Sequence, residues 1–381
     1  MIRRRNILVL TLTLLGCVGV LWVTPLSHPG ARDLSFRISD EAFWGMISDF
    51  SEPNGYFRSD NLLSNEDAFQ TVIPRLKTSV TRGGAYLGVG PEQNFTYVVA
   101  VQPRVAFIVD IRRLNLDEHL LYKALMELSA DRAEFLSRLF SRKRPAGLGA
   151  TSTVEALFEA YSRVAASGIL FQQNLQAVKD WLVKHHGFKL TNDDLKNIEY
   201  VYGVFREAGP DLNYSFSGGW PGGRWGRFPT YAALMMETDG SGQHQSYLGT
   251  EANFRILRGL ETNNVVIPVV GDFAGDKALR AVGRYLKEQG MTVSAFYTSN
   301  VEQYLFREND AWKRFFGNVG ALPIDGSSTF IRSVNRGFGY PPYGSGPGRR
   351  AQTRLCPIAD LLHAFSEGKI YSYNDIAEMS K

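Results

Sequence analysis

Residues 85–113, AYLGVGPEQNFTYVVAVQPRVAFIVDIRR, decide the fold of this chain. The pattern predicts a strand that ends in Gly88-Val89-Gly90, a short helix from Pro91, and a second apolar strand that ends in Asp110. Asp110 follows Gly90 by 20 residues. This spacing is typical of the first βαβ unit of a nucleotide-binding sheet, in which glycines let a ligand approach the backbone and the acid binds ribose hydroxyls.

The glycine pattern is incomplete, and the missing glycines narrow the choice of ligand. A dinucleotide fingerprint has a third glycine where this chain has Gln93, and a GxGxG loop has one where it has Glu92. A carboxylate at Glu92 opposes the phosphate that a helix N-terminus otherwise attracts. The pattern therefore favours a nucleoside ligand without phosphates, such as S-adenosylmethionine, over NAD. Arg112 and Arg113 keep NADP open, and an ordinary strand–turn–helix junction is a further alternative.

Residues 1–30 are predicted to be a membrane anchor or signal segment. Arginines at positions 3–5 precede an uncharged, apolar run that extends to position 23, which orients the arginines toward the cytoplasm. The segment either remains as an anchor, is cleaved near Ala31, or contains a lipobox at 14–17 in which Cys17 is acylated. In each case we expect the domain, residues 31–381, to face the periplasm or the cell surface, and an uncleaved anchor or an acylated Cys17 would make the protein membrane-associated.

Composition excludes several classes of partner. The 381 residues have a net charge of +4 and scattered basic side chains, so nucleic acid is not expected as a partner. Cys356 is the one cysteine outside the apolar segment, which excludes an intrachain disulfide or a CxxC site within the domain. Of the six histidines only His185 and His186 are adjacent, and the pattern predicts no metal site. The partners that we expect are a small-molecule or nucleoside-type ligand and, through the N-terminal segment, the membrane.

From residue 31 onward we expect one α/β domain with a Rossmann-like, mostly parallel sheet. The polar run FSEPNGYFRSDNLLSNE at 50–66 suits a ligand-covering loop or an N-terminal strap. Residues 114–207 have helical periodicity and predict a large helical insertion. The stretch 213–231, NYSFSGGWPGGRWGRFPTY, combines glycines, tryptophans and arginines, which predicts either a mobile lid or an ordered surface loop.

Polar residues follow three predicted strands at their carboxyl ends. The apolar run 265–270 is typical of a central parallel strand and ends in Gly271-Asp272, and the strand 292–297 leads into polar residues at 298–303. Together with Gly88 and Gly90 they predict a ligand site at the carboxyl edge of the sheet. Further elements are expected as helices at 251–259, 277–289, 358–366 and 373–379, a last strand at 329–334, and an exposed loop at 337–350.

With these segments placed, the chain resembles a bacterial family of largely uncharacterised, methyltransferase-like proteins that includes a spirochaete outer-surface lipoprotein with a class I methyltransferase fold. The likeness covers residues 34–304 and rests on FSEPNGYFRSDNLLSNE, YLGVGPEQNFTYV, FIVDIRR, VIPVVGDFAGDKALRAVG and FYTSNVEQYLF. It implies a class I methyltransferase-type sheet, S-adenosylmethionine as cofactor, Gly88 and Gly90 in the glycine loop and Asp110 on the ribose. It places Asp272 after the fourth strand, among substrate-facing residues.

The resemblance leads to one function and two alternatives. A methyltransferase that uses S-adenosylmethionine would place Glu92 and Gln93 near the sulfonium-bearing tail and would orient its acceptor with Asp272, Asn300 or Glu302. The first alternative is a non-catalytic extracytoplasmic binding or structural protein that retains the fold. It is motivated by the cytoplasmic origin of S-adenosylmethionine, by the lack of an acid before the glycine loop, and by the lack of a DPPY-like motif at 271–273. An NADP or nucleotide-sugar enzyme is the second, supported only by the two arginines after Asp110.

Overall fold

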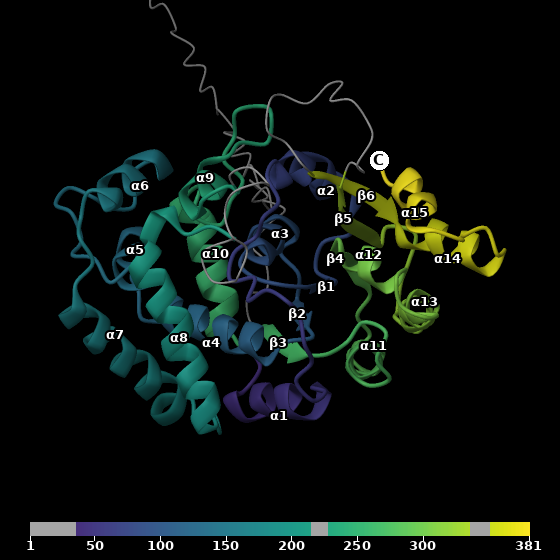
Figure 1. The fold of residues 1–381 in the computed structure, drawn as a ribbon, viewed down its shortest axis with the longest axis horizontal. Coiled ribbons are helices and arrows are strands. Elements are labelled where there is room, and N and C mark those ends of the chain that lie inside the picture. The colour runs from purple at the N-terminus through teal and green to yellow at the C-terminus, as the bar shows by residue number, and fades with distance from the viewer. Residues whose placement is uncertain (1–35, 215–227, 336–350) are drawn as a thin grey trace, which may run out of the picture. The chain divides into compact units, whose positions relative to one another are not determined.

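Six strands form one sheet in the order β3-β2-β1-β4-β5-β6 (Figure 1). The structure is a computed structural model that describes residues 36–214, 228–335 and 351–381. Its strands are β1 Ala85–Gly88, β2 Val105–Asp110, β3 Val266–Val270, β4 Val293–Ser299, β5 Thr329–Asn335 and β6 Ala351–Pro357. Neighbouring strands pair in parallel from β3 to β5, and β6 pairs antiparallel to β5. The predicted α/β fold with a mostly parallel, Rossmann-like sheet is confirmed.

The strand order places a topological switch between β1 and β4. The chain passes from β1 to β2 and β3 on one side, and then returns to β4 on the other side of β1. Because β1 to β5 are parallel, their carboxyl ends meet at one edge of the sheet, and the switch opens a crevice there. Gly88, Asp110, Val270 and Ser299 end the four strands that surround this crevice.

β3 is an edge strand, not the central strand that its apolar sequence predicts. All of its residues are buried because the segment before β1 covers the open edge. The Ser51 hydroxyl accepts the backbone N–H of Val270 (3.0 Å), and the Glu52 N–H donates to the Val270 carbonyl (2.8 Å). Pro268 fits an edge position since proline has no N–H for a second neighbour.

Helices surround the sheet. Their bounds are α1 Asp40–Phe50, α2 Ile73–Ser79, α3 Gln93–Val101, α4 Arg113–Glu127, α5 Arg132–Leu139, α6 Val154–Ser162, α7 Gly168–Asp180, α8 Asn192–Ala208, α9 Tyr231–Met236, α10 Glu251–Thr262, α11 Ala278–Glu288, α12 Val301–Leu305, α13 Ala311–Gly320, α14 Ile358–Ser366 and α15 Tyr373–Met379. Short turns η1 Phe69–Val72, η2 Trp181–His185 and η3 Gly209–Asp211 adjoin them. α3 contacts β1 and β4, α4 contacts β2 and β3, α1 packs on β3, and α11 packs on β2.

The predicted helical insertion at 114–207 consists of helices, although its boundaries differ from the prediction. α4 packs against β2 and β3, so it belongs to the layer that covers the sheet. The added helices are α5 to α9, and Figure 1 shows α5 to α8 gathered beside α4 and far from β6. α8 begins with a reciprocal capping box that Thr191 and Asp194 form.

Three sequence predictions lie wholly or mainly outside the described residues: the anchor or signal segment at 1–30, most of the stretch 213–231, and the loop at 337–350. In the ranges that the structure does describe, none of the helices combines the length and apolar character needed to cross a bilayer.

Candidate functional site

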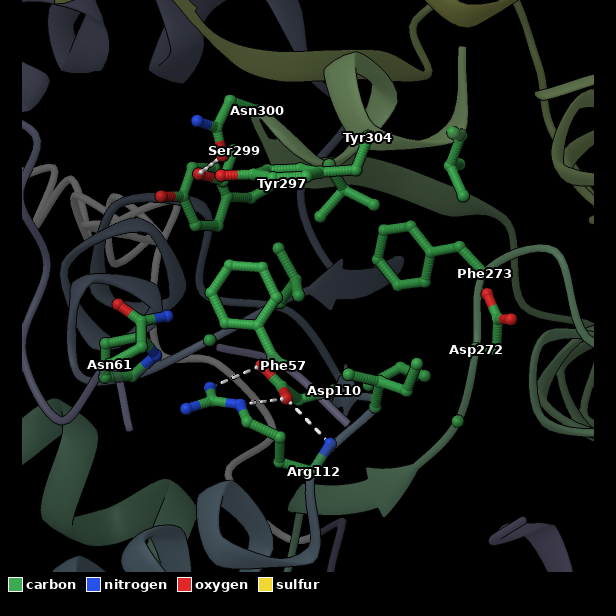
Figure 2. A pocket seen from close by; sticks show the side chains of 18 of the residues that line it. Phe57, Asn61, Asp110, Arg112, Asp272, Phe273, Tyr297, Ser299, Asn300 and Tyr304 are labelled. Carbon is green, nitrogen blue, oxygen red and sulfur yellow. Dashed lines mark hydrogen bonds and ion pairs between the residues drawn. The ribbon is translucent and has the colours of Figure 1, made fainter. Parts of the chain in front are cut away.

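A cavity of about 220 Å³ opens at the carboxyl edge of the sheet, where the sequence predicts a ligand site (Figure 2). We call residues 51–67, which precede β1 and cross this edge, the strap. The cavity is lined by the strap (Tyr56, Phe57, Asn61, Ser64, Asn65, Glu66), the turn after β1 (Val89, Gly90, Pro91), the ends of β2 (Val109, Asp110, Ile111, Arg112) and β3 (Gly271, Asp272, Phe273), and the end of β4 with the residues that follow (Tyr297, Ser299, Asn300, Val301, Tyr304, Leu305, Glu308).

The strap is fixed by hydrogen bonds along the strand ends. The Glu52 carboxylate accepts the backbone N–H groups of Asp272 (3.0 Å), Lys277 (3.0 Å) and Ala278 (2.8 Å), which places a negative charge at the N-terminus of α11. The Gly55 N–H donates to the Ile111 carbonyl (2.8 Å). The run therefore packs along the domain as the predicted strap, and part of it lines the cavity, while its role in covering a ligand stays a prediction.

Asn94 shapes the glycine turn. Its Nδ2 donates to the carbonyls of Val89 (2.9 Å), Gly90 (3.1 Å) and Pro91 (2.8 Å), while the Tyr86 hydroxyl donates to its Oδ1 (2.9 Å). Gly90 lines the cavity and has φ +78°, which favours glycine.

Gly88 does not line the cavity. A Cβ on Gly88 would collide with Asn94 Oδ1 and lie 2.8 Å from Tyr86 Cε1. Its role is thus to admit Asn94 rather than to touch a ligand. His119 Nε2 lies 2.9 Å from the Gly90 carbonyl, and because a carbonyl only accepts, this nitrogen carries the proton.

Asp110 lies beside the glycine turn in the cavity lining, as predicted, but Arg112 already binds it. Oδ1 accepts the backbone N–H and Nε of Arg112, and Oδ2 accepts Nη2, each at 2.9 Å. Arg112 also donates to the carbonyls of Ser59 and Asp60 in the strap. Oδ2 accepts a single hydrogen bond here and keeps acceptor capacity for a hydroxyl group. Figure 2 shows this pair below the ring of Phe57.

Glu92 is buried away from the cavity, so its side chain does not occupy the predicted position near a ligand tail. Its Oε2 accepts the Ser64 N–H (3.4 Å), and its Oε1 has no partner among the described residues. Burial, with the nearby Glu66 charge adding to it, raises the pKa of Glu92 to about 8. A carboxyl with that pKa is mostly neutral at pH 7, which removes the charge on which the argument against phosphate relied.

Replacing Glu92 by glutamine should make the protein less sensitive to alkaline pH. The pKa rises from 4.5 to about 8 on folding, so the folded state binds the proton more tightly and stability falls as pH rises through this window. We expect E92Q to gain stability over the wild type, on the order of a few kcal/mol, between pH 5 and pH 9. Urea unfolding at both pH values measures the free energy of unfolding of the two proteins. An equal change in that free energy between pH 5 and pH 9 in both would contradict the raised pKa of Glu92.

Gln93 also points away from the cavity lining and into a buried polar group. Its Nε2 donates to Glu66 Oε2 (3.1 Å) and to the Tyr97 hydroxyl (3.1 Å), and its Oε1 accepts the Ser64 hydroxyl. Gln93 therefore holds the strap residue Glu66, which does line the cavity. A ligand would meet Gln93 only through that carboxylate.

Asp272 and Asn300 both line the cavity, from its two ends. Asp272 follows β3, so its predicted place after the fourth strand is wrong: β4 ends in Ser299 and is followed by Asn300. Figure 2 places Asp272 next to Phe273 and on the opposite side of the cavity from Ser299 and Asn300. Asp272 Oδ1 accepts the Ala274 N–H (2.8 Å) and remains partly exposed.

Glu302 does not face the cavity, which corrects its assignment as a residue that orients the acceptor. It is buried in a two-pronged ion pair, with Arg332 Nε 2.7 Å from Oε2 and Nη2 3.0 Å from Oε1. Thr298 donates to the same Oε2 (3.3 Å). The pair joins the end of β4 to β5, because Ser299 and Arg332 are register partners.

Sequence reasoning missed Glu66, Ser299 and the aromatic side chains of the cavity. Ser299 has φ +50°, next to a shift in the β4–β5 register, and its hydroxyl donates to Glu66 Oε1. Left-handed backbone at a non-glycine residue is uncommon and is typical of sites where a side chain is re-aimed. The rings of Phe57 and Tyr304 pack edge to face, with their centroids 5.5 Å apart. Two sequence signals pointed to part of this set: the polar run 298–303, which contains Ser299, and the aromatic and polar run 50–66, which contains Phe57 and Glu66.

The lining has an excess of negative charge. Glu66, Asp110, Asp272 and Glu308 are acidic, and Arg112 is the one basic residue among the described lining residues. Arg112 is paired with Asp110, and Arg113 is paired outside the lining with Asp194 (2.9 Å). The remaining carboxylates have no basic partner within the described ranges. The site thus suits a neutral or cationic ligand better than a phosphate.

The fold and the site define a Rossmann-like α/β protein with a cavity at the switch point of its sheet. Residues 62–360 match the family described as a domain of unknown function (DUF7790), and the chain belongs to that family. No curated protein matches the chain. The family description names no methyltransferase, so the methyltransferase resemblance stays a prediction.

Proposed function

We propose that this chain binds S-adenosylmethionine in the cavity at the carboxyl edge and is a methyltransferase-like protein. The observation that carries the proposal is the charge of the lining. S-Adenosylmethionine carries a sulfonium, an ammonium and no phosphate, and it meets three carboxylates without a basic partner, Glu66, Asp272 and Glu308. NADP and nucleotide sugars are polyanionic, and Arg112 and Arg113, which alone supported them, already bind Asp110 and Asp194.

The order of the strands suggests how the ligand lies. Ribose hydroxyls would bind Asp110 Oδ2 at the end of β2, with the glycine turn alongside. The base would extend toward β3, where Phe273 offers a ring face and Asp272 an acceptor for an exocyclic amine. The sulfonium-bearing tail would then lie toward β4, near Ser299 and Asn300.

Methyl transfer places few chemical demands on a protein. The sulfonium is already a good leaving group, so the protein mainly aligns a nucleophile with the methyl group and excludes water. Asn300 offers an amide at the β4 end that can orient an acceptor. Tyr56, which is 84% exposed, and Phe57 belong to the strap and border the same cavity.

Calorimetric titration tests the ligand class. We expect the full-length chain, purified in a mild detergent, to bind S-adenosylmethionine and S-adenosylhomocysteine, and to bind NADP at least about 100-fold more weakly or not at all. D110N should lose affinity for both adenosyl ligands, because it removes a charged acceptor of the ribose hydroxyls. Tight binding of NADP, or equal binding by D110N, would contradict the proposal.

The second candidate is a non-catalytic binding or structural protein that retains the fold outside the cytoplasm. It is favoured by the basic and then apolar sequence at 1–23, which predicts an extracytoplasmic domain away from the pool of S-adenosylmethionine. A C-terminal alkaline phosphatase fusion tests the orientation, since this enzyme is active only outside the cytoplasm. Phosphatase activity together with no binding of either adenosyl ligand would support this candidate over the first.

A further inference from the structure

Glu66 is a buried carboxylate in the cavity lining that no basic side chain neutralises among the described residues. It is 3% exposed, yet it borders the cavity. Its hydrogen-bond partners are neutral: Ser299 Oγ donates to Oε1 and Gln93 Nε2 donates to Oε2 (3.1 Å). Buried carboxylates are normally paired with a cation, so an unpaired one at a cavity wall calls for an explanation.

The carboxylate is held in one orientation by groups that are themselves fixed. Gln93, at the start of α3, is bound by Tyr97 and Ser64. Ser299 donates to Glu66 from a left-handed backbone conformation at the end of β4. The Ser64 hydroxyl accepts the Glu66 N–H (3.2 Å). A rigid carboxylate of this kind is suited to select a ligand charge, since little reorganisation is needed on binding.

The position of Glu66 relates it to a particular part of the proposed ligand. It lies between the start of α3, which follows the glycine turn, and the end of β4. With ribose at Asp110 and the base toward Asp272, this is the end of the cavity where the sulfonium would lie.

We propose that Glu66 is a specificity-determining residue that recognises the positive charge of the S-adenosylmethionine sulfonium and so favours this ligand over S-adenosylhomocysteine. This inference rests on the proposed function above. The two ligands differ by one methyl group and one positive charge, and a fixed anion beside the sulfur distinguishes them by charge. The same residue would favour release of the neutral product after methyl transfer.

The competing account is a Glu66 that is protonated and therefore neutral. Burial raises the pKa of this carboxyl above its usual value, and hydrogen bonds from Ser299, Gln93, Tyr297 and Ser333 offset that rise only in part. A neutral Glu66 would hydrogen-bond within the protein and would not separate the two ligands. The two accounts predict different results for the isosteric variant E66Q.

The test is titration of the full-length wild type and E66Q with S-adenosylmethionine, S-adenosylhomocysteine and sinefungin, in which an amine carried on carbon replaces the methylated sulfur. We expect E66Q to bind S-adenosylmethionine and sinefungin at least about tenfold more weakly, the size of a lost charged contact. Its affinity for S-adenosylhomocysteine should stay within about twofold, because this ligand has no charge at sulfur. Unchanged ratios between the three ligands in E66Q would overturn the inference.

Two carboxylate variants serve as matched controls. D272N should weaken the three ligands by a similar factor, because Asp272 lies at the base end that they share. E308Q, at an exposed position of the lining, removes a charge that solvent screens, so it should change the preference among the three ligands less than E66Q does. If the wild type binds none of the three ligands, the proposed function itself fails. If it binds them and E66Q keeps the wild-type preference, only the role of Glu66 fails.

Discussion

Replacing Glu302 by glutamine is expected to destabilise the protein by about 3–5 kcal/mol, the usual cost of leaving one partner of a buried ion pair alone. Arg332 is wholly buried and Glu302 is 1% exposed, so water cannot solvate the charge that remains. The guanidinium has other contacts, with the ring of Phe330 (4.2 Å) and the Ser380 hydroxyl (3.3 Å), but none of them carries an opposite charge. Urea unfolding followed by circular dichroism measures the loss.

A double variant separates the ion pair from general damage to the core. R332M alone leaves the Glu302 carboxylate buried without its partner, and adding E302Q removes that charge. We therefore expect E302Q/R332M to be more stable than R332M by about 2 kcal/mol or more. If the loss of stability in the double variant equalled the sum of the losses in E302Q and R332M, the two charges would not be coupled. The pair would then not be what fixes the end of β4.

Replacing Asn94 by alanine is expected to weaken binding of S-adenosylhomocysteine by about 100-fold and to lower stability by roughly 2–4 kcal/mol, since it leaves several buried groups without partners. One amide holds three successive carbonyls of the turn after β1, and its oxygen accepts the Tyr86 hydroxyl. Without Asn94, nothing else among the described side chains donates to the Val89 and Pro91 carbonyls in this way. Titration and urea unfolding measure the two effects.

Y86F is the matched control for Asn94. It removes the hydroxyl that donates to Asn94 Oδ1 and leaves the three contacts of Nδ2 intact. A loss of about 1 kcal/mol in stability is expected, with affinity within a few-fold of the wild type. If Y86F and N94A weakened the ligand equally, or if N94A bound it like the wild type, the turn would not depend on the amide.

The local pattern was sufficient to predict the first βαβ unit and most helices. Glycines at 88 and 90 and the apolar run that ends in Asp110 identify β1 and β2, and the helical periodicity of residues 114–207 identifies the helices α4 to α8. β6 was missed. Its sequence, AQTRLCP, has few β-branched residues and begins next to a loop rich in glycine and proline. Pairing with β5, more than pattern, makes it a strand.

The order of strands and the partners of charged residues could not be predicted, because both depend on contacts far apart in the sequence. The resemblance placed Asp272 after a fourth strand, whereas it follows β3. The apolar run before it predicted a central strand, whereas α1 and the strap provide that burial at the edge. Glu302 was assigned to the site from its position after β4. Its partner Arg332 lies one strand away, and only the β4–β5 register brings the two together.

The candidate site was likewise predicted only in part. Gly90, Asp110, Asp272 and Asn300 were predicted from the carboxyl ends of strands, and the structure brings them to one cavity. Glu92 and Gln93 start the helix after the turn, but their side chains point into the buried layer behind it. The direction in which a side chain points from a helical turn depends on how the helix packs, and residue spacing in the sequence does not specify that packing.

A crystal structure of the full-length chain with S-adenosylhomocysteine would show whether the cavity binds the ligand as proposed. We expect the ligand in the cavity, with a ribose hydroxyl within hydrogen-bond distance of Asp110 Oδ2, the base beside Phe273 and Asp272, and the sulfur toward Ser299. The ligand bound elsewhere, or a ribose remote from Asp110 at saturating concentration, would contradict the proposal.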